Sequence, residues 1–270
     1  MSVIRRELHE LSRIDVFARQ DTWIHRIDAR AKVLATFVFL LCVVSFPRYA
    51  VLPLLPFVIF PVVIASLGRL PLGWLVQRLL VASPFALMVG IANPLVDQTP
   101  VAILPGHSIA AGWLSFASIG LRFLLTTAVA LLLIATTGMP AICEALRQLR
   151  IPEAFVTQLQ LLYRYLFLLG EEAMRMERAR DLRSCGRRGT GLWVSGTLLG
   201  ALLLRTVARA NRIYAAMLLR GFEGTIRPAS LRALTRRDLV FLLGWSTAFL
   251  ICRQVPVGEL LGHAVIGARL

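Results

Sequence analysis

The chain has 270 residues, 57% of them hydrophobic, with a mean hydropathy of +0.71 and a formal charge of +15. A soluble domain is closer to half apolar, so these values predict an integral membrane protein with a basic cytoplasmic face. A basic nucleic-acid-binding protein would not need several apolar segments, and we exclude nucleic acid as a partner. Lys32 is the single lysine. The chain therefore contains no lysine-bearing P-loop, and any ATP must be hydrolysed by another protein.

Long uncharged runs predict an all-α polytopic membrane protein with about five transmembrane helices. A span needs about 20 apolar residues, so the shorter runs must include flanking residues. Prolines at positions 53, 56 and 61 are expected to kink the second span. A linker at 68–71 and an amphipathic stretch precede the third span, and Arg122 interrupts the fourth. The five runs are 33–46, 49–67, 79–96, 109–137 and 239–252.

The distribution of charge predicts the orientation. Residues 1–32 carry seven Lys or Arg and residues 138–238 carry 17 Arg, whereas the loop 97–108 carries none. By the positive-inside rule the N-terminal segment 1–32 and the segment 138–238 are cytoplasmic. Four spans in a membrane domain at 33–137 agree with both segments lying on one side. The last span and the C-terminal tail then occupy 239–270.

The cytoplasmic segment 138–238 has its own helical pattern. A short helix is predicted over 140–149 and a long one over 153–184, which at about 1.5 Å per residue extends roughly 48 Å. A third helix is expected from Leu192 to Arg220. Glu171 and Arg175 have the spacing and order of a favourable helix pair. Three arginines of the third helix, Arg205, Arg209 and Arg212, are spaced to share one face.

Both long helices end in the same short pattern, Ala-x-x-Leu-Arg-small-x, at 179–185 and at 216–222. A single arginine at a helix C-terminus ordinarily complements the helix dipole. Two matching ends favour a paired docking function on a partner with two-fold symmetry. Arginine suits this task because its planar fork binds carboxylates through two hydrogen bonds and stays charged.

Three stretches of the chain resemble the transmembrane T component of energy-coupling factor transporters, in its cobalt-transport type. The first is the family's N-terminal signature, here His25, Arg26, Asp28, Arg30 and Lys32. The other two are the coupling motifs, which the family writes as Ala-Arg-Gly or close variants. In this chain they are Leu182-Arg183-Ser184 and Leu219-Arg220-Gly221. Neither keeps alanine directly before the arginine, and Ser184 replaces glycine.

The resemblance implies a non-enzymatic subunit of a multi-pass transporter in a bacterial inner membrane. In such a transporter the two arginine ends dock on two ABC-type ATPases, which bind ATP and Mg, and the long helices pass their motion to a separate membrane subunit that binds substrate. This chain would bind no cofactor or metal of its own. The substrate would be cobalt or nickel, with a vitamin such as biotin as an alternative. Residues expected to support the coupling helices are Ala179, Arg180, Ala216, Arg205, Arg209 and Arg212.

Several residues carry structural expectations of their own. Asp28 with Arg26, Arg30 and Lys32 is expected to form an interfacial salt-bridge cluster that fixes the first membrane helix, and His25 to join a local polar network. Gly196 and Gly200 form a Gly-x-x-x-Gly pair, which would suit a close crossing of the two long helices. Arg122 has three alternatives: an ion pair with a carboxylate, a contact with the substrate subunit, or an outward-reaching side chain. A structural role is ranked first.

Two other classes of protein are alternatives to a transporter subunit. A membrane enzyme acting on phosphate-bearing lipids would need clustered carboxylates or histidines near the interface, and these are scarce in the sequence. An autonomous secondary transporter would show inverted repeats with interrupted helices at the membrane midplane, and the sequence shows no such repeat. ATPases with P-loops that co-purify with this chain would favour the transporter subunit over both.

Overall fold

The computed structural model describes residues 13–96, 100–104, 107–183, 192–224 and 234–254. These residues divide into two compact units. The long-helix unit comprises the described residues of Met1–Val16 and Met139–Leu231, and the bundle unit those of Phe17–Gly138 and Arg232–Leu270.

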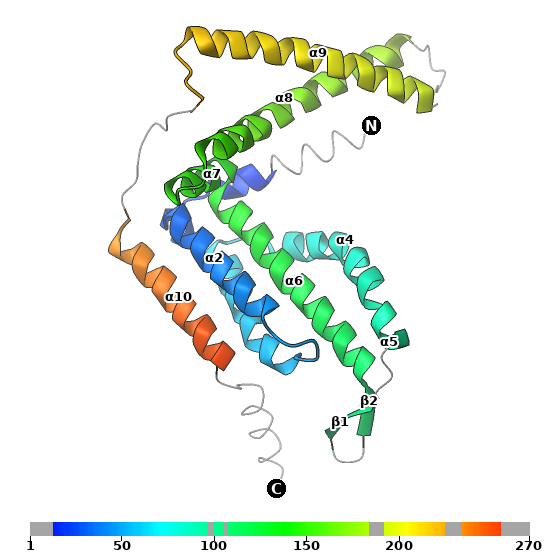
Figure 1. Ribbon diagram of the computed structural model, residues 1–270, viewed down its shortest axis with the longest axis vertical. Helices are drawn as coiled ribbons and strands as arrows, with labels where there is room; N and C mark the ends of the chain where they lie inside the picture. Colours follow the sequence, from blue (N-terminus) through cyan, green and yellow to red (C-terminus); the bar gives the residue numbers. More distant parts are fainter. Residues whose placement is uncertain (1–12, 97–99, 105–106, 184–191, 225–233, 255–270) are drawn as a thin grey trace. The chain divides into compact units, whose positions relative to one another are not determined.

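The bundle unit is a set of packed helices in which α2, α6 and α10 lie side by side (Figure 1). Helix α6 also packs against α3, α4 and α5. The elements in chain order are η1 (Ile24–Arg26), α2 (Ala29–Val44), η2 (Leu52–Val58), α3 (Ile59–Leu67), α4 (Leu72–Gly90), α5 (Ala92–Val96), β1 (Pro100–Leu104), β2 (His107–Ala110), α6 (Ala111–Thr137) and α10 (Arg236–Gln254).

Aromatic rings form the centre of the bundle unit. Phe39 of α2 and Phe249 of α10 are buried, with ring centroids 5.2 Å apart, and Phe57 and Phe60 pack on both. Trp245 closes the cluster with its ring 4.8 Å from that of Phe60. Edge-to-face aromatic pairs add stabilisation beyond their buried area. The cluster therefore holds the first and last apolar helices of the sequence together.

Two helices of the structure have the length and composition to cross a membrane, namely Leu72–Pro94 and Ala111–Thr137. At 27 residues the second is about 40 Å long, more than the roughly 30 Å hydrocarbon core of a bilayer. These two correspond to the predicted third and fourth spans. The runs at 33–46 and 239–252 fall within α2 and α10, and the number of spans stays a prediction.

The proline-rich second run does not form one α-helix. Its first part, η2, is a 3-10 helix with Pro53 in its first turn and Pro56 inside it, and only from Ile59 does the chain become α-helical. Proline lacks the backbone N–H of an α-helical hydrogen bond, and its ring clashes with the preceding turn. The predicted kink is therefore a change of helix type.

Two other boundaries differ from the prediction. The amphipathic stretch before the third span is continuous with it, because α4 begins at Leu72 and includes Pro84 in its interior. The segment expected as a loop contains a two-stranded antiparallel hairpin, β1 and β2. Apart from this hairpin and the η elements, the regular structure of the described residues is α-helical.

The long-helix unit consists of α7 (Met139–Gln148), α8 (Glu153–Arg183) and α9 (Leu192–Leu219). Helix α7 packs on α8, and α8 contacts α9. These bounds confirm the three helices predicted after residue 138. The expected Glu171–Arg175 pair is present at 3.9 Å, and Glu172 lies 3.6 Å from the same arginine. Gly186 and Gly189, whose positions in the sequence predict the break between the two long helices, lie outside the described residues.

Candidate functional site

The C-terminal end of α8 is exposed. Arg183 is the last residue of the helix, and its side chain is exposed. The Leu182 side chain beside it is 83% exposed. One turn earlier Arg180 is engaged by Asp181 at 2.8 Å. Ser184, the third residue of the motif, lies outside the described residues. The end of α8 therefore presents one guanidinium and one apolar side chain to solvent.

The end of α9 has the same character and a defined stop. Gly221 has φ +78°, and the backbone N–H of Phe222 donates to the carbonyl of Met217 while that of Gly221 donates to Leu218. This pair of bonds is the Schellman C-cap, in which glycine takes the left-handed conformation at low cost. Arg220 thus stands at the capping position, exposed, beside a Leu219 side chain that is 90% exposed.

Arginines of α9 line a shared groove against α8, as their spacing predicted. Arg205, Arg209 and Arg212 lie with Leu169 and Glu172 around an opening of about 210 Å³. Within it Arg205 donates to the Glu172 carboxylate at 2.9 Å. The two long helices therefore meet through charged side chains.

The predicted glycine crossing is wrong for this structure. No described atom lies within 4 Å of a Cβ built on Gly196 or Gly200. A close backbone crossing would have placed the facing helix there. The contact instead falls further along α9, where the longer Arg205 side chain reaches across to α8. The remaining supporting positions, Ala179 and Ala216, are the first residues of the two end motifs.

The N-terminal signature caps a helix and keeps one pair of the expected salt-bridge cluster, Arg30 with Asp28 at 3.8 Å. Asp28 is buried and accepts a hydrogen bond from the backbone N–H of Arg30, which caps α2. Its own backbone N–H donates to the carboxylate of Asp238 at 2.8 Å. The other carboxylate oxygen of Asp238 accepts from the N–H of Thr235 at the start of α10. One buried carboxylate therefore joins the beginnings of α2 and α10.

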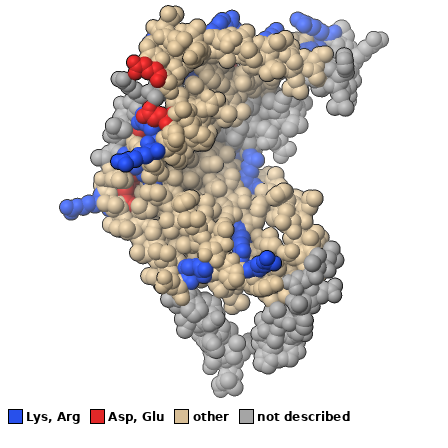
Figure 2. Space-filling model, in the orientation of Figure 1, with Lys and Arg blue, Asp and Glu red and all other residues tan. Residues whose placement is uncertain are grey.

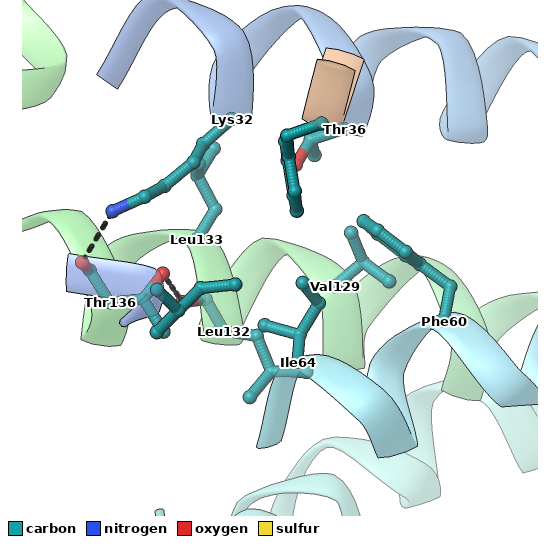
Figure 3. Close-up of a pocket in the computed structure, with 10 residues that line it drawn as sticks. Lys32, Thr36, Phe60, Ile64, Val129, Leu132, Leu133 and Thr136 are labelled. Carbon is teal, nitrogen blue, oxygen red and sulfur yellow. Dashed lines mark hydrogen bonds between the residues drawn. The ribbon is translucent and has the colours of Figure 1, made fainter. Parts of the chain in front are cut away.

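Lys32 ties the same region to α6. Its side chain is buried, and its ammonium donates to the backbone carbonyl of Thr136 at 2.9 Å, next to the last residue of that helix (Figure 3). The last carbonyls of a helix lack partners within it, and a cation there also complements the dipole. A small cavity of about 20 Å³ beside Lys32 is lined mainly by apolar side chains, including Ile64 and Val129.

The other two signature residues make local contacts. Arg26 forms a two-pronged ion pair with Asp21, at 2.8 and 2.9 Å, and takes no part in the Asp28 network. His25 shares a 2.7 Å hydrogen bond with the Thr22 hydroxyl and a 3.0 Å bond with the Phe17 carbonyl. Burial and the nearby Lys32 lower the pKa of His25 below its usual range. The expected salt-bridge cluster is therefore present only in part: Arg30 lies 3.8 Å from the Asp28 carboxylate, whereas Lys32 binds a backbone carbonyl and Arg26 binds Asp21. The expected polar network around His25 is confirmed.

Asp238 was not identified from the sequence, although a signal for it exists. Thr235-Arg236-Arg237-Asp238 has the spacing of a capping box, in which an acidic residue at the third helical position reaches back to the N-cap backbone. That pattern predicts the contact with Thr235. It does not predict the bond to Asp28, whose position lies 210 residues away.

Arg122 has a structural partner. Its guanidinium donates to the carbonyl of Pro47, just beyond α2, while its Nε has no hydrogen-bond partner among the described residues. At the same turn Arg253 of α10 donates to Ser45 and lies over the Phe46 ring, 4.5 Å from its centroid. Two arginines therefore fix the turn that follows α2. The role of Arg122 is structural, as ranked first, but its partner is a backbone carbonyl and not the expected carboxylate.

Many large apolar side chains of the described residues are exposed. On the face shown in Figure 2, most of the area carries neither acidic nor basic side chains. Leu80, Phe85 and Met88 of α4 are all more than 60% exposed, a burial pattern that suits lipid or another membrane protein. Among the described residues, no three His, Cys, Asp or Glu side chains are grouped so as to hold a metal ion.

Comparison with known proteins places the chain in a family of transport proteins. A model of the cobalt transport protein family matches residues 20–230. The chain belongs to this family, and the resemblance inferred from its motifs is confirmed.

Individual relatives include two named transport proteins. The chain is 28% identical to the uncharacterized protein MJ1571 of Methanocaldococcus jannaschii, over 87% of this chain and 84% of the relative. It is 32% identical to the cobalt transport protein CbiQ of Rhodobacter capsulatus, over 37% of this chain and 41% of that protein. It is 29% identical to the nickel permease LarQ of Lactiplantibacillus plantarum, over 48% and 47% of the respective chains.

Proposed function

We propose that this chain is the energy-coupling subunit of an uptake transporter of the energy-coupling factor type. In this proposal two separate ABC-type ATPases bind the ends of α8 and α9 and hydrolyse ATP. The long helices carry the resulting motion to a membrane subunit that binds the substrate. The chain itself performs no catalysis.

The two exposed helix ends carry the proposal. Leu219 and Leu182 are the most exposed large apolar side chains among the described residues, and each precedes an exposed arginine. One exposed leucine on a protein surface needs no explanation. The same leucine–arginine pair at the ends of two adjacent helices fits two equivalent grooves, each with an apolar floor and a carboxylate.

A second surface supports a partner in the membrane. Helix α9 exposes Leu199, Leu203 and Val207, which are spaced four residues apart and so share one face. The stripe continues to Tyr214 and Leu218. An apolar stripe on a long helix suits a helical partner, and we assign it to the substrate-binding subunit.

The proposed location is a bacterial inner membrane, with residues 1–32 and 138–238 in the cytoplasm. The charge distribution supports this orientation, because the exposed arginines of the long-helix unit would face the side where the ATPases are. The proposed substrate is cobalt or nickel, after the names of the relatives. Biotin or another vitamin is the alternative, and uptake of radiolabelled metals by cells that express the whole transporter decides between them.

Reversal of charge at the two ends tests the proposal. Arg183→Glu and Arg220→Glu should each reduce recovery of the ATPases with the tagged chain, and the double variant should lose both recovery and uptake. Truncating a buried charge pair at an interface costs about 2–5 kcal/mol, which corresponds to at least a 30-fold loss of affinity. Arg164→Glu is the matched control, because Arg164 is an exposed arginine in α8 away from its end. Undiminished recovery and uptake by the double variant would refute the docking role.

A further inference from the structure

The bundle unit contains an open groove beside the start of α10 that takes no part in the proposed coupling. Its volume is about 610 Å³, within the range of ligand-binding pockets. One wall comes from the segment before η1 and the other from α10. The groove is lined in part by Trp23, Arg236, Arg237, Gly244, Trp245 and Ala248.

The lining is basic at one end and apolar along the rest. Arg236 and Arg237 are exposed, and neither has an ion pair with a described residue. Further along α10, Gly244 and Ala248 lie four residues apart on one face, and no described atom is within 4 Å of a Cβ built on Gly244. From Arg237 to Ala248 the helix rises about 16 Å. The groove thus joins a pair of guanidinium groups to an apolar trough.

Two tryptophans flank the trough. Trp245 is held in place by ring contacts with Phe60 and Phe249, at 4.8 and 5.7 Å. Trp23, before η1, is 51% exposed. Tryptophan is enriched at the boundary between lipid and water, where its ring spans apolar and polar surroundings. Tryptophan beside exposed arginine is therefore a combination suited to the headgroup level of a bilayer.

We propose that this groove binds an anionic phospholipid of the cytoplasmic leaflet. The phosphate lies between Arg236 and Arg237, whose forks match its oxygens, and an acyl chain follows Gly244 and Ala248 along α10. The inference rests on the proposed orientation, which puts the start of α10 at the cytoplasmic surface. A helix of a partner subunit would also fit against Gly244 and Ala248. An anionic lipid is favoured because it satisfies the two guanidinium groups as well as the trough.

Quenching of tryptophan fluorescence by brominated lipids tests the proposal directly. The full chain, purified in a mild detergent, is titrated with dibrominated phosphatidylglycerol and, separately, with dibrominated phosphatidylcholine. Wild type should reach half-maximal quenching at a lower mole fraction of phosphatidylglycerol. Loss of that quenching in Trp245→Phe assigns the signal to the groove.

Substitutions separate the two parts of the groove. Arg236→Gln with Arg237→Gln should raise the mole fraction for half-maximal quenching by phosphatidylglycerol about 25-fold, about fivefold for each arginine. The control Arg48→Gln with Arg69→Gln removes the same charge from exposed positions of the bundle unit. Gly244→Leu fills the trough and should reduce quenching by both lipids. Its control is Gly73→Leu, at another helical glycine with no described atom near its Cβ.

Three results would overturn the proposal. The first is equal quenching of wild type by the two lipids, and the second is unchanged quenching after loss of both arginines. The third is a combined result: the groove shows no preference between the two lipids, and Gly244→Leu releases a membrane subunit that co-purifies with wild type. The groove would then be a contact with that protein. The Arg183→Glu, Arg220→Glu double variant should be quenched like wild type. Failure of ATPase docking and failure of lipid binding are thus distinguishable.

Discussion

Replacement of Asp238 should be among the most destabilising single changes in the bundle unit. Its side chain is 3% exposed, and its two carboxylate oxygens accept backbone N–H groups of Asp28 and Thr235, both at 2.8 Å. A hydrogen bond to a charged group contributes about 1.5–3 kcal/mol, so Asp238→Ala should lower the free energy of unfolding by about 3–5 kcal/mol. Asp238→Asn retains one acceptor oxygen but turns an amide N–H toward the second donor, and should lose roughly half to all of this amount.

Thermal unfolding of the purified chain in detergent measures the effect. For a chain of this size about 1 kcal/mol corresponds to a shift of 2–4 °C in Tm, so Asp238→Ala should lower Tm by about 6–20 °C. The control is Asp21→Asn, which removes a carboxylate that is 73% exposed, and its Tm should match wild type. If Asp238→Ala unfolds within 2 °C of that control, the carboxylate does not hold α2 and α10 together.

Three further changes test other parts of the structure. Lys32→Met should lower stability by about 1–2 kcal/mol in the same melt, because the lost bond to Thr136 is partly offset by removal of a buried charge; a higher Tm would contradict this. Gly221→Ala should weaken hydrogen-exchange protection at the end of α9 by about 1 kcal/mol or more, because the φ of Gly221 is +78°. The control Gly200→Ala, within α9 where no described atom lies near the added Cβ, should strengthen the helix slightly. Equal effects of the two changes would contradict the C-cap. The pKa of His25 is lowered in the folded chain, so the unfolded chain takes up a proton first as pH falls through about 6.5, and stability decreases there. His25→Gln should show a smaller decrease in Tm between pH 7.5 and 5.5, and an unchanged slope would contradict the shift.

The long helices could be predicted closely because their ends depend on neighbouring residues. At Gly221 α9 stops, because the Gly221 N–H donates to Leu218 and the Phe222 N–H donates to Met217, all within a few positions of the chain. The motif at each helix end is likewise local, and so is the spacing that puts Arg205 and Arg212 on one groove. Such features follow from helix geometry alone, whatever the rest of the chain does.

The N-terminal signature could be located from sequence but not interpreted. Charge pairing suggested a cluster of Asp28 with three cations. Of these, Arg30 lies 3.8 Å from Asp28, whereas Lys32 binds the carbonyl of Thr136, 104 positions away, and Arg26 binds Asp21. Burial decides the partner of Lys32, because a buried backbone group without a hydrogen bond costs more than an exposed ion pair contributes. Which helix ends are buried together is a property of the tertiary fold.

The contact between α8 and α9 limits how the proposed coupling can work. Its ion pair, Glu172 with Arg205, has an arginine that is 64% exposed, and pairs of this kind contribute about 0–1 kcal/mol. Such a contact cannot alone make two long helices move as one body. The stiffness must come from partners, and the stripe at Leu199, Leu203 and Val207 offers apolar area for this, worth about 25 cal/mol for each Å² buried. We therefore expect the long-helix unit to gain hydrogen-exchange protection along α9 when the membrane partner binds, before any ATPase is added. Protection that appeared only with the ATPases would mean that the membrane partner does not stabilise α9. The role assigned to the stripe would then be wrong.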